Sequence, residues 1–239
     1  MKIIAINGSS KGSAGNTFML LSKLSEGIFR AKGDMEVINL SDCRIEPCSG
    51  CYSCWQNNGH CVHSDAMQSI INKILSIDIL ILASPVYSHN VSLHMKKFID
   101  RMTFMASVTK LYMSNDGTYI HEAIGKIPPI VLLSSCNLIE YSNFDVVRLY
   151  VNTVAKHLST EVIAEICRTQ MPVLKMKGDV QKIVSEAYLK SLVQAGYELA
   201  TDNNLTKKTA INLKRDLVAG KFFAEYVNEN AEHKVFELF

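Results

Sequence analysis

The chain has 239 residues, of which 48% are hydrophobic and 20% are charged, with 25 Lys and Arg against 23 Asp and Glu. This length suits one sizeable α/β domain with an appendage and argues against a second large domain. The net charge of +2 comes without a long basic or acidic block, so the composition gives no support to a nucleic-acid or membrane partner. We therefore expect the partner to be a small molecule.

The amino terminus and the cysteine content predict a cytoplasmic location. Residues 1–6 lead directly into Asn7 and Gly8, without the charged start and longer apolar core of a signal peptide. No apolar run approaches the roughly 20 residues that span a bilayer. The seven cysteines are odd in number and locally clustered, which fits a reducing compartment better than a disulfide scaffold.

The first part of the chain alternates between short apolar runs and amphipathic stretches. Residues 2–7 (KIIAIN) and 35–40 (MEVINL) predict two strands. The stretch between them has the apolar spacing of a helix, at Phe18, Leu21, Leu24 and Ile28. Asp65 is a predicted N-cap for a second helix, which carries Met67, Ile70, Ile71, Ile74 and Leu75.

The middle of the chain continues the same alternation. Residues 78–84 (DILILAS) form a continuous apolar run, typical of a strand that is buried on both faces. A third helix is indicated by Met95, Phe98, Ile99 and Met102. Residues 112–125 are polar and irregular and contain a turn signal at Asn115, Asp116 and Gly117. Residues 130–135 (IVLLSS) predict a fourth strand, and a helix is expected at about 144–157.

Residues 161–166 predict a fifth strand, and residues 180–200 predict a fifth helix with one apolar side, formed by Ile183, Ala187, Tyr188, Leu192, Ala195 and Leu199. Five strand and helix pairs predict an α/β fold with a doubly wound five-stranded parallel sheet, which we expect in the order 2-1-3-4-5.

We place this domain at residues 1–202, with a cysteine-rich loop inside it and a C-terminal helical extension at 203–239. The extension is too apolar for a free tail, because it carries Leu213, Leu217, Phe222, Phe223, Tyr226, Phe236, Leu238 and Phe239. The sequence leaves two interpretations open. The extension packs on its own domain, or it exchanges with a second subunit.

Ligands of open α/β sheets bind beyond the carboxyl ends of the strands, so the loops after the first, third and fourth strands should converge. The first loop, residues 8–17, offers hydroxyls, backbone N–H groups, one lysine and a helix N-terminus, all of which donate to phosphate. It matches neither the nucleoside-triphosphatase nor the dinucleotide-binding pattern. We interpret it as a monophosphate site, the alternative being an ordinary strand-to-helix connection.

The second loop, residues 84–90 (SPVYSHN), follows the buried third strand with a proline, an aromatic residue and free polar groups. This composition suits a flat ring that lies against backbone edges. Tyr87 taken alone would more often be a packing residue.

Four cysteines form a C-x2-C-x2-C-x6-C pattern, at Cys48, Cys51, Cys54 and Cys61. Four interpretations remain open: a [4Fe-4S] cluster, a zinc site, a reversible thiol pair, and plain buried cysteines in a subunit contact. Zinc is disfavoured because structural zinc sites usually join two C-x2-C pairs across a longer loop. Trp55 follows the third of these cysteines and either covers a cofactor or simply packs. The remaining cysteines, Cys43, Cys136 and Cys167, are interpreted as small core residues.

Three motifs together resemble the flavodoxin-like NAD(P)H-dependent FMN reductases, and within them the iron-sulfur flavoproteins. They are I-N-G-S-S-K-x4-N-T at the start, P-C-S-G-C-Y-S-C-W with Cys61 and Asp65 after it, and S-P-V-Y-S-H-N-V-S-x2-M-K-x-F-I-D-R at residues 84–101. The resemblance spans about residues 2–200. It implies FMN, with Ser9, Lys11, Asn16 and Thr17 at the phosphate and Pro85, Val86, Tyr87, Ser88 and Asn90 around the isoalloxazine ring and ribityl chain.

The sequence departs from the family in the loop after the fourth strand. A glycine-containing turn usually approaches the flavin there, whereas residues 134–140 (SSCNLIE) contain no glycine. Two arrangements are then open: the loop stands further from the ring, or it contacts the ring through Ser135 or Cys136.

The resemblance also implies an activity, namely electron transfer from NAD(P)H as co-substrate to a small acceptor such as a flavin or quinone. It implies a homodimer or dimer of dimers, and a cluster on the four cysteines would relay single electrons. We name no catalytic side chain, because flavin chemistry needs few protein acids or bases, and we interpret His89 and His94 as structural. Two alternatives stay open: an iron-sulfur electron-transfer protein that serves a redox protein partner without nicotinamide turnover, and a non-enzymatic cysteine-based metal or redox-sensing module.

Overall fold

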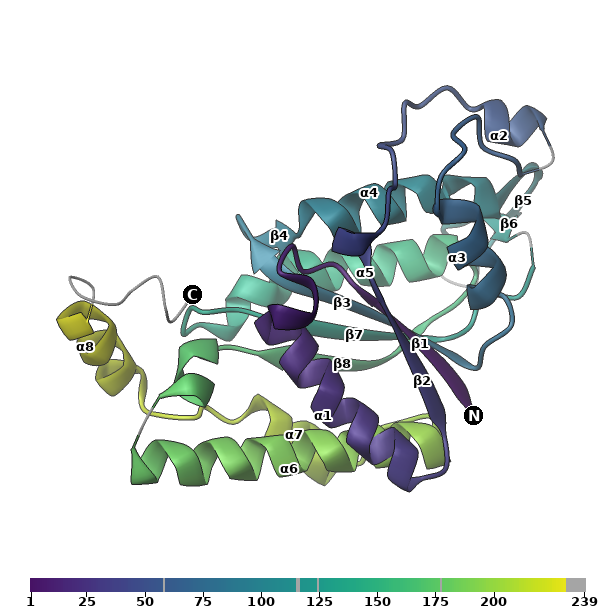
Figure 1. The fold of residues 1–239 in the computed structure, drawn as a ribbon. Coiled ribbons are helices and arrows are strands. Elements are labelled where there is room, and N and C mark those ends of the chain that lie inside the picture. The colour runs from purple at the N-terminus through teal and green to yellow at the C-terminus, as the bar shows by residue number, and fades with distance from the viewer. Residues whose placement is uncertain (58, 115–116, 124, 177, 231–239) are drawn as a thin grey trace.

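The computed structural model describes residues 1–57, 59–114, 117–123, 125–176 and 178–230. Its main sheet has the parallel strand order β2-β1-β3-β7-β8, which confirms the predicted order (Figure 1). These strands are β1 (Lys2–Asn7), β2 (Asp34–Asn39), β3 (Ile79–Tyr87), β7 (Ile130–Ser135) and β8 (Val162–Arg168). The short β4 (Asn90–Val91) folds back antiparallel on the end of β3.

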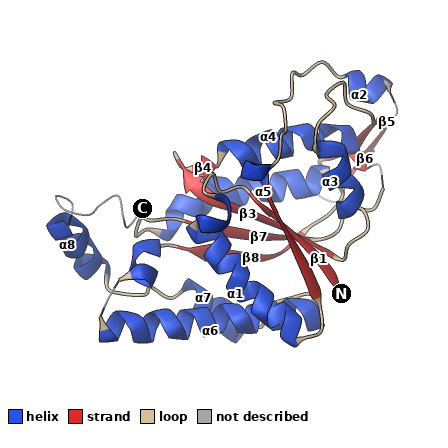
Figure 2. Ribbon diagram, viewed as in Figure 1, coloured by secondary structure: helices blue, strands red, loops and turns tan. Residues whose placement is uncertain are grey.

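Helices cover both faces of this sheet (Figures 1 and 2). One face carries α1 (Asn16–Arg30), α6 (Asp179–Asp202) and α7 (Lys207–Lys214), and the other carries α3 (Met67–Ile74), α4 (Leu93–Arg101) and α5 (Asp145–His157). Short 3-10 turns connect them: η1 (Gly12–Ala14), η2 (Leu40–Asp42), η3 (Met102–Met105), η4 (Tyr141–Phe144) and η5 (Met171–Lys175).

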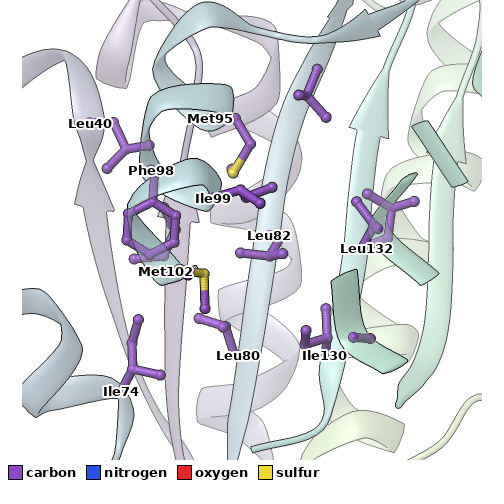
Figure 3. Packing of buried hydrophobic residues seen from close by; sticks show 14 of the residues in the cluster. Leu40, Ile74, Leu80, Leu82, Met95, Phe98, Ile99, Met102, Ile130 and Leu132 are labelled. Atoms are coloured by element: carbon purple, nitrogen blue, oxygen red, sulfur yellow. The ribbon is translucent and has the colours of Figure 1, made fainter. Parts of the chain in front are cut away.

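The position of strand β3 in the middle of the sheet explains why its sequence is a continuous apolar run. Leu80 and Leu82 pack against α3 and α4, while Ile79 and Ile81 belong to the second core on the opposite face. Successive side chains of a strand point to opposite faces, so a central strand covered on both sides needs apolar residues at every position. Figure 3 shows the first of these cores, where Phe98, Ile99 and Met102 of α4 and η3 face the sheet.

Helices α1 and α6 approach each other closely because glycine stands at the contact on both. A Cβ atom on Gly27 would lie 1.8 Å from the Val193 carbonyl oxygen, and one on Gly196 would lie 1.9 Å from the Leu24 carbonyl oxygen. The two backbones therefore touch directly. This contact fixes the direction of α1, whose amino end begins the site described below.

The prediction of an irregular stretch at residues 112–125 was wrong. The structure forms an antiparallel hairpin there, from β5 (Ala106–Met113) and β6 (Tyr119–Ala123). Its sequence lacks the usual alternation, since Leu111, Tyr112 and Met113 are all exposed in succession. Tertiary contacts stabilise the hairpin, including one between the hydroxyls of Tyr112 and Ser159 at 2.9 Å. Residues 115–116 of the predicted turn lie outside the described residues.

Two smaller predictions need correction. Asp65 precedes the N-cap of α3, which is Ala66, although its carboxylate accepts a hydrogen bond from the Met67 N–H at 3.0 Å. On α6, Ile183 is 66% exposed and Ala187 is exposed as well, because they lie on a different side of the helix from Ser185 and Tyr188, which are buried. The remaining predicted apolar positions of α6 are buried, namely Tyr188, Leu192, Ala195 and Leu199.

The carboxyl-terminal segment folds as α7 and α8 (Gly220–Asn230), and its Leu213, Leu217 and Phe223 are buried in the core on the α1 and α6 side. Glu198 of α6 anchors it by accepting hydrogen bonds from the Thr206 N–H and the Thr209 hydroxyl. Phe236, Leu238 and Phe239 lie outside the described residues. Within the described part of the chain, no helix has the length and apolar character needed to cross a bilayer.

Candidate functional site

A cavity of about 230 Å³ opens at the carboxyl ends of β1, β3 and β7. Nine of the ten residues predicted to bind the cofactor line it: Ser9, Lys11, Asn16, Thr17, Pro85, Val86, Tyr87, Ser88 and Ser135. The cavity therefore lies where an open α/β sheet receives its ligand.

Asn7, the last residue of β1, shapes the loop that follows. It is fully buried; its amide Nδ2 donates to the Gly12 carbonyl at 3.2 Å and to Asn39 Oδ1 at 2.9 Å. Its Oδ1 accepts a hydrogen bond from the Ser9 N–H at 3.1 Å. One side chain thus folds residues 8–12 back toward the sheet, a role that the sequence analysis did not assign to it.

The amino end of α1 opens into the same cavity. No side chain caps the helix at Gly15, and the first N–H groups of an α-helix have no partner inside the helix. A Cβ on Gly15 would lie 2.5 Å from Ser9 Oγ, so the loop and the helix start are closely packed. Asn16 Oδ1 is buried without a hydrogen-bond partner among the described residues. This end of the cavity therefore offers N–H donors with a positive helix dipole, and one unused acceptor.

A second cation lies close to Lys11. Burial, followed by the nearby charge of Lys11, lowers the pKa of Lys175, which ends η5 after β8. Because Lys11 lines the cavity, a second lysine near it adds positive charge that favours an anion on this side. The sequence analysis missed Lys175, because only the fold brings residue 175 next to residue 11.

The loop after β3 is held by buried hydroxyls. Ser84 Oγ accepts from the Ser92 N–H at 2.9 Å, Ser134 Oγ donates to the Ser84 carbonyl at 2.8 Å, and Ser92 Oγ donates to the Gly8 carbonyl. These bonds join the ends of β1, β3 and β7 to the start of α4. Beyond them Tyr87 is 45% exposed at the cavity, and Ser88 and His89 both adopt left-handed backbone conformations.

The loop after β7 completes the cavity. Thr17 Oγ1 lies 3.1 Å from Ser135 Oγ in a buried contact that joins the start of α1 to the end of β7. Cys136, Asn137 and Leu138 continue the wall, although this loop contains no glycine. Cys136 lines the cavity, and so do Asn137, Leu138 and His89, which the sequence analysis did not select.

Asn90 is the predicted cofactor residue that does not line the cavity. It lies in β4, where its Oδ1 accepts a hydrogen bond from the Val91 N–H at 2.8 Å. In the turn between β3 and β4, the residues that line the cavity are Ser88 and His89.

The cysteine-rich loop lies at the other end of α4 (Figure 1). Cys48 and Cys51 are exposed, and Cys54 and Cys61 are half-buried. Among the described residues, no three His, Cys, Asp or Glu side chains come close enough together to hold a metal ion. The described part of this loop therefore does not form a site for a single metal ion.

Trp55, in the short α2 (Ser53–Gln56), packs beside the cysteines. Its indole N–H donates to the Thr103 carbonyl at 3.2 Å, and its ring lies 5.7 Å from that of His121 in β6. Trp55 thus joins the cysteine loop to the hairpin. This contact corresponds to the simpler of the two interpretations of this residue, in which it packs.

A buried ion pair fixes the cysteine loop to the end of α4. Arg101 Nη1 lies 2.7 Å from Asp65 Oδ2, and the two side chains are 2% and 1% exposed. Arg101 Nη1 also donates to the Glu46 carbonyl at 2.8 Å. Burial raises the pKa of Asp65, but hydrogen bonds from Arg101, Glu46 and Met67 outweigh it and hold this pKa below its usual value.

The thiols around this pair differ in acidity. Hydrogen bonds from Ser53 and Ser49 lower the pKa of the exposed Cys51 to about 7. Burial raises the pKa of Cys54, and the neighbouring Cys61 and Cys48 raise it further. Cys51 is therefore the more easily ionised of these two thiols.

The fold and this cavity define a flavodoxin-like α/β protein, which agrees with the solved structures that the chain resembles. One is an FMN-dependent NADH-azoreductase from Bacillus anthracis in complex with FMN, with a TM-score of 0.62 and 16% identity, matched over 84% of this chain and 99% of that one. Another is the NAD(P)H:quinone oxidoreductase from Methanothermobacter marburgensis, with a TM-score of 0.59 and 16% identity over 86% of this chain and 98% of that one. At this identity the likeness concerns the fold alone.

Residues 1–117 match the family model of the NADPH-dependent FMN reductases. An iron-sulfur flavoprotein of Archaeoglobus fulgidus is 34% identical over 101 residues, which are 42% of this chain and 48% of that protein. The predicted resemblance to the FMN reductases, and within them to the iron-sulfur flavoproteins, is thereby confirmed for the amino-terminal half. The chain spans about half the length of the curated relatives it matches.

Proposed function

We propose that this chain is an FMN-dependent oxidoreductase that passes electrons from NAD(P)H to a small acceptor such as a flavin or quinone. The observation that carries the proposal is the cavity of about 230 Å³, which is lined by Lys11 and the N-terminus of α1 together with Tyr87 and the loops after β3 and β7. Such a site suits an elongated ligand with one phosphate and one flat ring. The family match of residues 1–117 and the fold likeness support FMN as that ligand.

The residues present fit this cofactor. The uncapped start of α1 and the lysine pair Lys11 and Lys175 supply donors and positive charge for a phosphate. The buried and unpartnered Asn16 Oδ1 is an acceptor that a ligand hydroxyl would satisfy. When bound, FMN would supply hydride and single-electron chemistry. The protein's part is to hold the phosphate end, orient the ring against residues 85–89 and 135–138, and leave one approach open at the exposed Tyr87.

Flavin titration tests this proposal. Replacing Asn16 and Thr17 together by Ala should weaken FMN binding, because each lost polar contact to a charged group is worth about 1–3 kcal/mol. The matched control is Asn152→Ala with Thr153→Ala, the same dipeptide on α5 away from the cavity. Wild-type FMN affinity in the Asn16/Thr17 variant would remove the assignment. NAD(P)H added without oxygen should bleach the bound flavin, and its failure to do so would exclude the reductase activity.

The second candidate is an iron-sulfur flavoprotein that transfers electrons to a redox protein without nicotinamide turnover. The cysteine spacing and the similarity to the iron-sulfur flavoprotein of Archaeoglobus fulgidus support it. Iron and sulfide analysis after anaerobic purification decides between the two. Iron that is present in the wild type and lost in Cys51→Ala would support the cluster, and absence of iron from the wild type would exclude it.

A homodimer belongs to the same proposal. Leu93 of α4 and Leu149 of α5 are 70% and 71% exposed on neighbouring helices, which supports a contact between subunits on this face. Sedimentation of the wild type and of Leu93→Glu with Leu149→Glu would test it, and a monomeric wild type would refute it.

A further inference from the structure

The cavity wall formed by residues 136–138 is held from behind by the end of β8. The Cys136 N–H donates to the Arg168 carbonyl at 2.8 Å, and the Gln170 N–H donates to the Leu138 carbonyl at 2.9 Å. The Met171 N–H donates to the Cys136 carbonyl at 3.3 Å. The backbone of residues 168–171 therefore sets where this wall lies.

Gln170 occupies a special place in that backbone. It is fully buried and has a left-handed conformation with φ of 52°, which is unfavourable for a residue other than glycine and persists only where contacts enforce it. Its side chain provides such contacts. Oε1 accepts from the N–H groups of Leu217 and Val218 at 2.8 and 3.3 Å, and Nε2 donates to the Val218 carbonyl at 2.9 Å.

The same carboxyl-terminal stretch is also bound by Arg168. Its Nη1 donates to the Arg215 carbonyl at 2.7 Å, and its guanidinium lies 4.9 Å from the centre of the Tyr188 ring. Two buried side chains on either side of Thr169 thus attach the end of β8 to residues 213–218. Neither of them lines the cavity, so any effect on a ligand must pass through the loop 136–138.

We propose that Gln170 is a positioning residue, through which the carboxyl-terminal segment 215–218 holds the wall 136–138 of the flavin site in place. The inference rests on the proposed function, since it assumes that FMN occupies the cavity. Residues 170 and 215–218 lie outside the stretch 1–117 that matches the family model, so this coupling belongs to the remaining part of the chain. The wall offers no cation and no helix N-terminus, so it serves the part of the ligand other than the phosphate.

The experiment compares FMN with riboflavin, which lacks the phosphate. Gln170→Met keeps the length of the side chain and removes its hydrogen bonds to residues 217 and 218. We expect this variant to lower the affinity for both flavins by the same factor, about tenfold, because a buried polar anchor is lost. Gln170→Asn is the second variant, since Asn tolerates the left-handed conformation but is too short to reach residue 218. We expect the same equal loss of affinity for both flavins in this variant.

Glu198→Gln is the matched control, because Glu198 is also buried and anchors the carboxyl-terminal segment, at Thr206 and Thr209, away from the cavity. It should lower the melting temperature and leave both flavin affinities unchanged. The coupling is overturned if the Gln170 variants lose as much melting temperature as Glu198→Gln and their affinities for both flavins are the same as those of this control. It is also overturned if only FMN affinity falls, since that result would indicate the phosphate loop. A wild type that binds neither flavin overturns the proposed function itself.

Discussion

Removing the charge of Asp65 should destabilise the protein strongly, because it leaves Arg101 buried without a counter-charge. The carboxylate accepts two hydrogen bonds from Arg101, at 2.7 and 3.2 Å, and one each from the N–H groups of Glu46 and Met67. Removing one partner of such a buried pair costs about 3–5 kcal/mol. For Asp65→Asn we therefore expect a loss of about 3–5 kcal/mol in the free energy of unfolding, or about 6–20 °C in melting temperature for a domain of this size.

The assay is a double-mutant cycle by urea unfolding, with Asp65→Asn, Arg101→Met and the two combined. If the pair acts as a unit, the double variant should lose less stability than the sum of the single variants, by about 2 kcal/mol or more. Losses that simply add, or single losses below about 1 kcal/mol, would refute the reasoning. The exposed pair Lys96 and Asp100 on the same helix is a suitable control, since exposed pairs contribute little.

The same pair gives a pH dependence with a definite sign. The pKa of Asp65 is lower in the folded chain than in the unfolded one, so its contribution to stability is present above the unfolded value, about 3.9. That contribution is lost as the pH falls through the folded pKa. Between pH 5 and 3 the wild type should thus lose more free energy of unfolding than Asp65→Asn, and parallel curves would contradict the assignment.

Three further predictions concern other parts of the molecule. In the metal-free protein, alkylation of Cys51 by iodoacetamide should reach half its maximal rate near pH 7. The midpoint for Cys43 should lie well above this value, because burial and the charge of Asp42 raise the pKa of that thiol. Equal midpoints for the two thiols would contradict this prediction. Although Ala favours helices, Gly27→Ala should destabilise the protein by about 1–3 kcal/mol or more in thermal unfolding, because the added Cβ would collide with the Val193 carbonyl. Unchanged stability would refute the close contact between the two helices. Lys175→Gln should weaken the binding of FMN but not of riboflavin in fluorescence titrations, and the effect should be largest at low salt. An equal effect on the binding of both flavins would show that Lys175 does not face the phosphate.

The sequence predicted the sheet well because its strands are covered on both faces. Runs such as residues 79–83 are apolar at every position, and few other structures accommodate that pattern. The hairpin β5–β6 was missed because its stability comes from contacts with distant elements, such as Tyr112 with Ser159, and not from a local pattern. Ile183 was wrongly assigned to the core because apolar residues occur on more than one side of α6, so their spacing does not show which side is buried.

The site was predictable to the extent that its residues follow strand ends. Ser9, Asn16 and Tyr87 lie in loops directly after β1 and β3, where the topology requires a ligand cavity. Lys175 and Gln170 follow β8, and the roles proposed for them depend on neighbours that are distant in sequence, Lys11 in one case and residues 217–218 in the other. No local pattern identifies such residues.

Helix α4 connects the two chemically distinctive regions of the chain. At its amino end Ser92 caps the helix, accepting from the Met95 N–H, and donates to the Gly8 carbonyl beside the cavity. At its carboxyl end Arg101 holds Asp65 and, with it, the loop that carries the cysteines. Ser92 and Arg101 are nine residues apart in sequence, which corresponds to about 14 Å along the helix at 1.5 Å per residue, so the cavity and the cysteine loop lie at opposite ends of α4. Mixing a Cys51→Ala chain with an Asn16→Ala/Thr17→Ala chain tests whether the cysteines of one subunit serve the cavity of another. Electron transfer that is restored in the mixture would show that they do, and a mixture without activity would show that they do not.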